Sequence, residues 1–108
     1  MKVEFEKEYL QELYEHGKTS DKNHRYQPQV VNNYLKCVKY LIKATRIEDL
    51  FLINSLNYKR LEGDKKGLSA VRINDKYRLE FHEKIDSNDT FRIEICSLVD
   101  ITNHYKKK

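Results

Sequence analysis

The sequence predicts an α+β domain in which N-terminal helices pack on one face of a small, twisted antiparallel sheet. Two observations support this fold class. Apolar residues recur at helical spacing through the first half of the chain, and after Asn57 they recur at every second position, as in β-strands. The length of 108 residues suits one domain, which we expect to span residues 1–108 and to bury one modest core.

A short strand and three helices are expected in the first half. Residues 3–5 alternate apolar and polar side chains, which favours a first strand at a sheet edge. Residues 7–16 then carry apolar side chains at helical spacing, and Gly17 is placed to end that helix. Residues 28–43 show one apolar face over several turns, which predicts the longest helix. The motif "TRIE" at 45–48 has the Ser/Thr-x-x-Glu form of a capping box and predicts a third short helix.

Three antiparallel strands are expected in the second half. Residues 70–73 alternate between two faces, and Asn74 with Asp75 supplies the turn residues where a hairpin reverses. Residues 77–82 form the returning strand. The segment "EKIDSNDT" is a polar loop, after which residues 91–101 are expected to form the last strand.

Alternation along the hairpin also places two arginines. Val71 and Leu79 fall on the face expected to meet the helices, so Arg72 and Arg78 project from the opposite, open face. Cations are placed at lower cost on a solvated helix, so their position on a sheet calls for an explanation.

The distribution of charge offers one. The formal net charge is +4, and the cationic excess is concentrated in residues 56–82 and in the tail "HYKKK" at 104–108. If the fold brings these segments together, they form a basic patch suited to a polyanion. The alternative is that these residues only keep the surface soluble.

Several classes of function lack support. No GxxxxGK[ST], GxGxxG or GxSxG motif occurs, so we expect neither a phosphate loop nor a hydrolase elbow. Cys37 and Cys96 have no metal-ligand spacing and are expected to be reduced and buried, and we expect no metal and no cofactor. No apolar run is long enough to span a membrane, and the start "MKVEFEKEYL" carries acids where a signal peptide needs an apolar stretch. A cytoplasmic protein is therefore expected.

The stretch "YKRLEGDKKGLSAVRINDKYRLEF" resembles the core signature of RelE/HigB-type toxins of bacterial type II toxin-antitoxin systems. In these toxins a Leu-x-Gly turn after basic residues leads into a hairpin. The matching pieces are "RLEG" at 60–63, "VRIN" at 71–74 and "YRLEF" at 77–81. The resemblance extends over the chain, and the long helical first half with the turn "RLEGDKKG" is most similar to the HigB subgroup.

The resemblance implies a RelE-like fold and a ribosome-dependent, metal-independent endoribonuclease that cuts mRNA in the decoding site and inhibits translation. It also implies a cognate antitoxin, HigA-like and carrying a helix-turn-helix domain, through which alone the toxin would meet operator DNA. Ribosome and mRNA are the other expected partners, and no membrane is expected.

Metal-free RNA cleavage needs the 2′-hydroxyl deprotonated, the phosphorane stabilised and the leaving 5′-oxygen protonated. Arg78 matches the family's "YR" position and, with Arg72, would hold the nonbridging oxygens from a rigid strand. The alternatives are ion pairs, of Arg78 with Glu80 or Glu94 and of Arg72 across the strands.

The resemblance also points to the tail and to the basic turn. His104 would protonate the leaving oxygen, and Tyr105 would stack on a base or orient the phosphate, unless both belong to a frayed terminus. Lys59 and Arg60 stand where relatives often place a histidine or lysine. Because Lys59 replaces the common histidine, the identity of the general base stays open. Further expected contacts to RNA or the ribosome are Lys65, Lys66, Lys76, Lys106, Lys107 and Lys108.

Two other functions compete with the nuclease. The same scaffold could serve a ParE-like toxin that inhibits DNA gyrase, because fold alone does not decide function. A catalytically inactive relative that only binds RNA or DNA is the third possibility.

Overall fold

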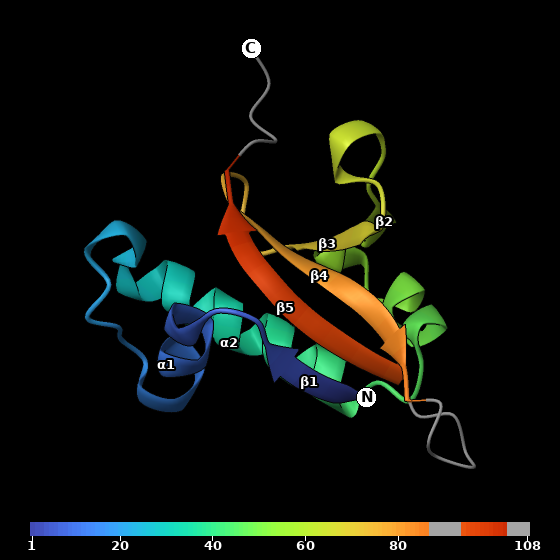
Figure 1. Ribbon diagram of the computed structural model, residues 1–108, viewed down its shortest axis with the longest axis horizontal. Helices are drawn as coiled ribbons and strands as arrows, with labels where there is room; N and C mark the ends of the chain where they lie inside the picture. The colour runs from blue at the N-terminus through green and yellow to red at the C-terminus, as the bar shows by residue number, and fades with distance from the viewer. Residues whose placement is uncertain (87–93, 104–108) are drawn as a thin grey trace.

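The computed structural model describes residues 1–86 and 94–103 (Figure 1). Its helices, in chain order, are α1 (Glu8–His16), η1 (Lys22–His24), α2 (Pro28–Lys43), η2 (Ile47–Leu52), η3 (Asn54–Leu56) and η4 (Gly63–Lys65), where η marks a 3₁₀ helix. The strands are β1 (Lys2–Phe5), β2 (Lys59–Arg60), β3 (Leu68–Arg72), β4 (Arg78–Ile85) and β5 (Glu94–Thr102). The predicted α+β class is confirmed.

The strands form one five-stranded sheet in the order β1-β5-β4-β3-β2. Strands β3 to β5 pair antiparallel, as expected, β1 lies at an edge as expected, and the short β2, which was not predicted, adds a further antiparallel strand beside β3. The sheet is nevertheless mixed, because β1 runs parallel to β5. The alternation at residues 3–5 predicts a strand but does not encode the direction of its partner, which lies at the other end of the chain. Parallel pairing lets β1 lead directly into α1 beside the sheet.

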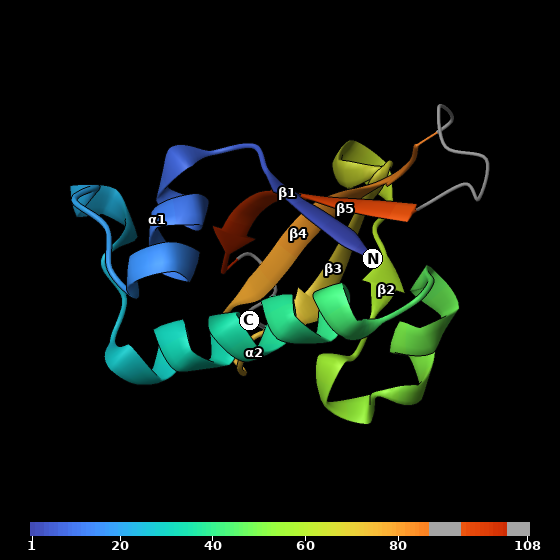
Figure 2. The same ribbon diagram turned by 90° about the horizontal axis from the view of Figure 1, so that it is seen from below.

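One face of the sheet is covered by helices. Figure 2 shows α2 running along that side, with α1 beside it and η2 beyond its C-terminal end. Fully buried side chains from both layers meet there, among them Leu10, Tyr34, Val71, Leu79 and Phe81. Each such aliphatic or aromatic side chain contributes about 1.5–3 kcal/mol through its removal from water. The buried Tyr34 hydroxyl also donates to the Leu10 carbonyl at 2.7 Å, which ties α2 to α1.

The two α-helices begin and end close to where the sequence predicts. The predicted helix at 28–43 matches α2, with Pro28 in its first turn. Helix α1 ends at His16 and is capped by Gly17, whose φ of 74° is left-handed and whose N–H donates to the Leu13 carbonyl at 2.9 Å. Glycine adopts that conformation without steric cost, which explains the stop.

The third helix differs in type and in its cap from the prediction. Residues 47–52 form the 3₁₀ helix η2, and the capping carboxylate belongs to Asp49, one residue after the expected Glu48. The Asp49 carboxylate accepts from the Thr45 and Arg46 backbone N–H groups at 2.8 and 3.3 Å. These hydrogen bonds to the charged form hold the pKa of Asp49 below its usual value.

Candidate functional site

Strand register divides the predicted cations between the two faces of the sheet. Residues paired across antiparallel strands lie on the same face, and neighbours along a strand lie on opposite faces. Arg72 pairs with Arg78, Ala70 pairs with Glu80, and Lys59 pairs with Ala70. Because Val71 and Leu79 belong to the helix-side core, these residues share the other side. We call it the open face and define it by Lys59, Arg72, Arg78, Glu80 and Thr102, the last of which pairs with Arg78.

Two arginines, Arg72 and Arg78, are paired directly across β3 and β4 on the open face. Arg72 forms an ion pair with Asp75 in the hairpin turn, so its partner is local and does not lie across the strands. Arg78 donates from Nη1 to the backbone carbonyls of Asn74 and Tyr77, at 2.5 and 3.0 Å. Both arginines are thus anchored to the same turn. Like charges placed opposite one another destabilise a sheet, so this pairing is typical of a site that needs concentrated positive charge.

The open face also holds a buried carboxylate that the sequence suggested only as an ion-pair partner for Arg78. Glu80 is 3% exposed. It accepts from Lys65 Nζ at 2.7 Å and from Thr102 Oγ1 at 3.2 Å. Lys65 belongs to η4, so the turn after β2 reaches the open face through this contact. Sequence reasoning gave Lys65 a role in binding RNA but had no signal for its position. Glu94, the other acid suggested for Arg78, lies at the opposite end of β5 and accepts from the Ile47 N–H at 3.0 Å.

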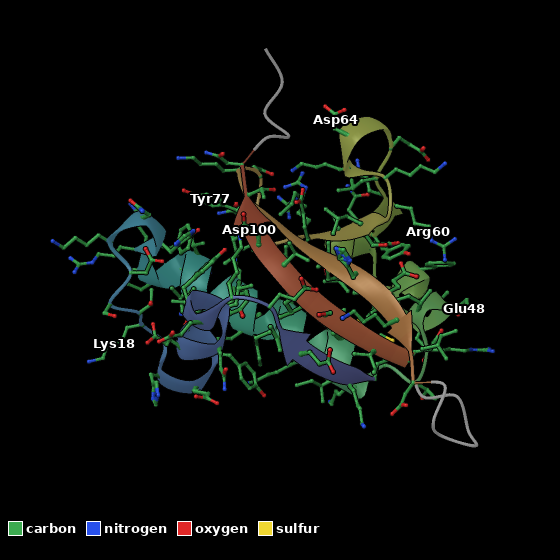
Figure 3. The ribbon with its side chains drawn as sticks, viewed as in Figure 1. Lys18, Glu48, Arg60, Asp64, Tyr77 and Asp100 are labelled. Atoms are coloured by element: carbon green, nitrogen blue, oxygen red, sulfur yellow. The ribbon has the colours of Figure 1, made fainter. Side chains whose placement is uncertain are left out.

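Lys59 and Arg60 are placed on opposite sides of the sheet. Lys59 is exposed on the open face. Arg60 pairs in register with Ser69 and lies on the helix side, where its Nη2 is 3.4 Å from Glu83 Oε1. Figure 3 shows Arg60 pointing away from the turn that carries Asp64 and toward the side of Glu48. The structure therefore separates Arg60 from the arginine pair.

Glu83 organises that helix-side position. Its carboxylate accepts from the Tyr58 and Ser69 hydroxyls as well as from Arg60. Burial, together with the hydrogen bond to Glu83, raises the pKa of Tyr58 above its ordinary value. These three contacts of Glu83 tie β2, and Tyr58 just before it, to β3 and β4.

An aromatic cluster on the helix side fixes the hairpin end from which Arg78 projects. Tyr77 packs edge-on against Tyr26 with ring centroids 5.2 Å apart, and Tyr9 stacks on His24 at 3.6 Å. The Tyr9 hydroxyl also donates to Asp100 and accepts from the Ile101 N–H. Tyr77 thus packs against the core.

The remaining predicted contacts fall on turns or in the tail. Lys66 is exposed after η4, and exposed Lys76 lies in the hairpin turn with Nζ 5.3 Å from the Tyr77 ring centroid. The predicted residues of the tail lie outside the described residues: His104, Tyr105, Lys106, Lys107 and Lys108.

Within residues 1–86 and 94–103, no three His, Cys, Asp or Glu side chains are grouped so that they could hold a metal ion. No helix in the described part of the chain is long and apolar enough to cross a membrane.

The arrangement of elements is also found in a solved structure of the same α+β class. The structure is similar to the YoeB/ParE toxin from Agrobacterium tumefaciens, with a TM-score of 0.58 over 97% of this chain and 100% of that chain, at 14% sequence identity. A family profile described as RelE-like toxin of type II toxin-antitoxin system HigB matches residues 3–92. Toxin HigB-1 of Vibrio cholerae serotype O1 (strain ATCC 39315 / El Tor Inaba N16961) is 34% identical over 82 residues, which cover 75% of this chain and 82% of that toxin. The chain therefore belongs to the HigB-like toxins of type II toxin-antitoxin systems.

This membership confirms the resemblance that "RLEG", "VRIN" and "YRLEF" predict from sequence. It also implies a cognate antitoxin as a partner, since toxins of this type are one half of a toxin-antitoxin pair.

Proposed function

We propose that this protein is an endoribonuclease that cuts mRNA on the ribosome without a metal ion and thereby inhibits translation. Membership in the HigB-like family supports endoribonuclease activity in general. The observation that carries the finer proposal is the Arg72–Arg78 pair, held in register on the open face and anchored at one turn.

Geometry explains why these cations lie on a sheet. Attack of the 2′-hydroxyl on the phosphate adds negative charge to the nonbridging oxygens in the transition state. A planar guanidinium can bind two such oxygens with parallel N–H donors, provided that its position is fixed in advance. The backbone carbonyls of Asn74 and Tyr77 hold Arg78 in this way. Arg78 is therefore assigned to the phosphate, with Arg72 as the second ligand.

The tail supplies the remaining chemistry in this proposal. Thr102 pairs with Arg78, and His104 follows two residues later in the sequence. His104 protonates the departing 5′-oxygen, for which an ordinary histidine pKa near 6.5 is suitable. Tyr105 stacks on a base beside the scissile bond. Lys59, on the open face, adds positive charge, whereas Arg60 serves the fold through Glu83.

Other basic residues bind the ribosome. Lys66, Lys76 and the lysines at 106–108 contact ribosomal RNA through its phosphates, which adds affinity without sequence specificity. Such contacts weaken as salt rises, so ribosome binding is expected to be salt-dependent. This function places the protein in the cytoplasm. We further propose that its antitoxin carries a helix-turn-helix domain and brings the pair to operator DNA.

The test is cleavage of mRNA on programmed ribosomes, mapped by primer extension, with Arg78→Ala beside the wild type. Codon-phased cuts are expected from the wild type. Removal of a charge-stabilising group should lower their rate by roughly 10²–10³-fold. Ile42→Ala, an exposed position on α2, is the matched control and should cut normally. A wild type that stops growth but leaves ribosome-bound mRNA intact would reject the nuclease and favour inhibition of gyrase.

A further inference from the structure

Glu80 is a buried carboxylate on the open face, the side of the sheet opposite α1 and α2. A carboxylate removed from water is costly unless charged or hydrogen-bonding partners replace the lost hydration. Glu80 is 3% exposed, and its described partners are the Lys65 ammonium and the Thr102 hydroxyl. The Lys65 side chain remains 34% exposed, so one end of this contact reaches solvent.

The turn between β2 and β3 is shaped to make this contact. Gly63 and Gly67 both have positive φ, 65° and 100°, which residues with a Cβ rarely adopt. The Leu61 N–H donates to the Leu68 carbonyl at 2.9 Å and closes the turn, and Leu61 itself is buried. Asp64 lies at the tip of the turn and points outward (Figure 3), while Lys65 turns back to Glu80.

One carboxylate therefore joins two segments that border the arginine pair. Lys65 comes from the turn after β2, and Thr102 ends β5 opposite Arg78. We propose that Glu80 is a positioning residue, which fixes Lys65 as a third phosphate-binding cation beside Arg72 and Arg78. This inference rests on the proposed function and assigns Lys65 to the cleaved phosphate, where sequence reasoning expected a general RNA contact.

Stability alone does not account for such a pair. Replacing a buried ion pair by apolar side chains is often neutral or stabilising, so a purely structural position gains little from charge. A lysine held at 2.7 Å by a buried carboxylate, in contrast, has lost most of the freedom that makes surface lysines poor at fixed phosphate contacts. A preorganised cation acts in the transition state, so its loss should lower the rate more than the affinity.

The test measures mRNA cleavage with toxin in excess over programmed ribosomes, which separates the maximal rate from the half-saturating toxin concentration. The variants are Glu80→Gln, Lys65→Met and the two combined. Glu83→Gln is the matched control, because Glu83 is a hydrogen-bonded carboxylate on the helix side of the same strand. Amide hydrogen exchange of residues 63–67 reports the turn independently of activity.

Each single variant should lower the maximal rate by roughly 10–100-fold, with little change in the half-saturating concentration. The double variant should be no slower than the singles, because both remove one interaction. Glu80→Gln should speed exchange at residues 63–67, and Glu83→Gln should change neither rate nor exchange there. If Glu80→Gln does not fold, Lys65→Met, altered at a part-exposed side chain, still gives the rate.

Three results would overturn the proposal: a wild-type maximal rate in Glu80→Gln, a wild-type rate in Lys65→Met, or additive losses in the double variant. A wild type that leaves mRNA uncut overturns the proposed function instead. Amide exchange then tests, independently of cleavage, whether Glu80 positions the turn. Faster exchange at 63–67 supports its positioning of the turn, and unchanged exchange rejects it.

Discussion

The two faces of β4 carry carboxylates of similar type with different partners. On the helix side, Glu83 accepts from the Tyr58 and Ser69 hydroxyls and lies 3.4 Å from Arg60. On the open face, Glu80 accepts from Lys65, which a separate turn supplies, and from Thr102. On the helix side, two neutral hydroxyls and one exposed guanidinium are the partners of Glu83 beside the core. The open face gathers charge, including two opposed arginines, at a cost to folding. The same strand thus serves stability on one side and a site on the other.

The strongest test of this difference between the two faces is to remove a large buried side chain from the helix side. Phe81 is fully buried between the helices and the sheet. Phe81→Ala should lower the free energy of unfolding by about 3–5 kcal/mol, through lost burial and the cavity left behind. Urea unfolding followed by circular dichroism measures the loss. At low temperature, where the variant is folded, its cleavage rate should match the wild type. A folded variant that cannot cut would show that the two faces are not separable.

The open face is tested by removing the repulsion between the paired Arg72 and Arg78. Arg72→Gln removes a charge directly across from Arg78 and should raise the free energy of unfolding by about 0.2–1 kcal/mol while cleavage falls. The ion pair of Arg72 with Asp75 partly offsets this gain, although Asp75 is 98% exposed and such pairs contribute little. The comparison is therefore repeated with Asp75→Asn in both proteins. If Arg72→Gln lowers the free energy of unfolding of the Asp75→Asn protein, the pairing of Arg72 with Arg78 does not destabilise the fold.

The smallest effect concerns the cap of η2. Hydrogen bonds from Thr45 and Arg46 lower the pKa of Asp49 in the folded protein. A lowered folded pKa means that the carboxylate stabilises the fold above its unfolded pKa, near 3.9, and that this contribution disappears as pH falls through the folded value. Asp49→Asn should therefore flatten the acid side of the stability profile slightly and leave cleavage at neutral pH unchanged. If the free energy of unfolding of Asp49→Asn falls with decreasing pH as steeply as that of the wild type, Asp49 does not contribute to acid stability.

Much of the fold could be predicted from local patterns in the sequence. The apolar stripe of 28–43 matches α2, Gly17 ends α1, and the turn at Asn74 reverses the hairpin. These features depend on neighbours within a few residues. The parallel pairing of β1 with β5 does not, because it joins opposite ends of the chain. The cap at Asp49 differs from the predicted one because a second acid directly follows "TRIE", and the 3₁₀ helix η2 uses that second acid as its cap.

The site divided in the same way. Alternation along β3 and β4 predicts that Arg72 and Arg78 share the open face, and their register agrees. Lys59 and Arg60 were grouped by sequence proximity, yet adjacent residues of β2 face opposite sides. The Lys65–Glu80 contact joins residues 15 apart through the shape of a turn. In "YRLEF" the sequence shows an acid two residues after Arg78, but nothing that pairs this acid with Lys65.

The two buried cysteines can report when the helix layer separates from the sheet. Burial raises the pKa of Cys37 and of Cys96 to about 12, so at neutral pH neither thiol in the closed protein is an effective nucleophile. The Cys37 thiol also donates to the Arg72 carbonyl at 3.3 Å, across the boundary between α2 and β3. Labelling of Cys37 by a thiol reagent therefore proceeds through separation of that boundary. The labelling rate therefore measures how often α2 separates from β3, the strand that carries Arg72. The native cysteine serves as the probe, so no label site has to be introduced.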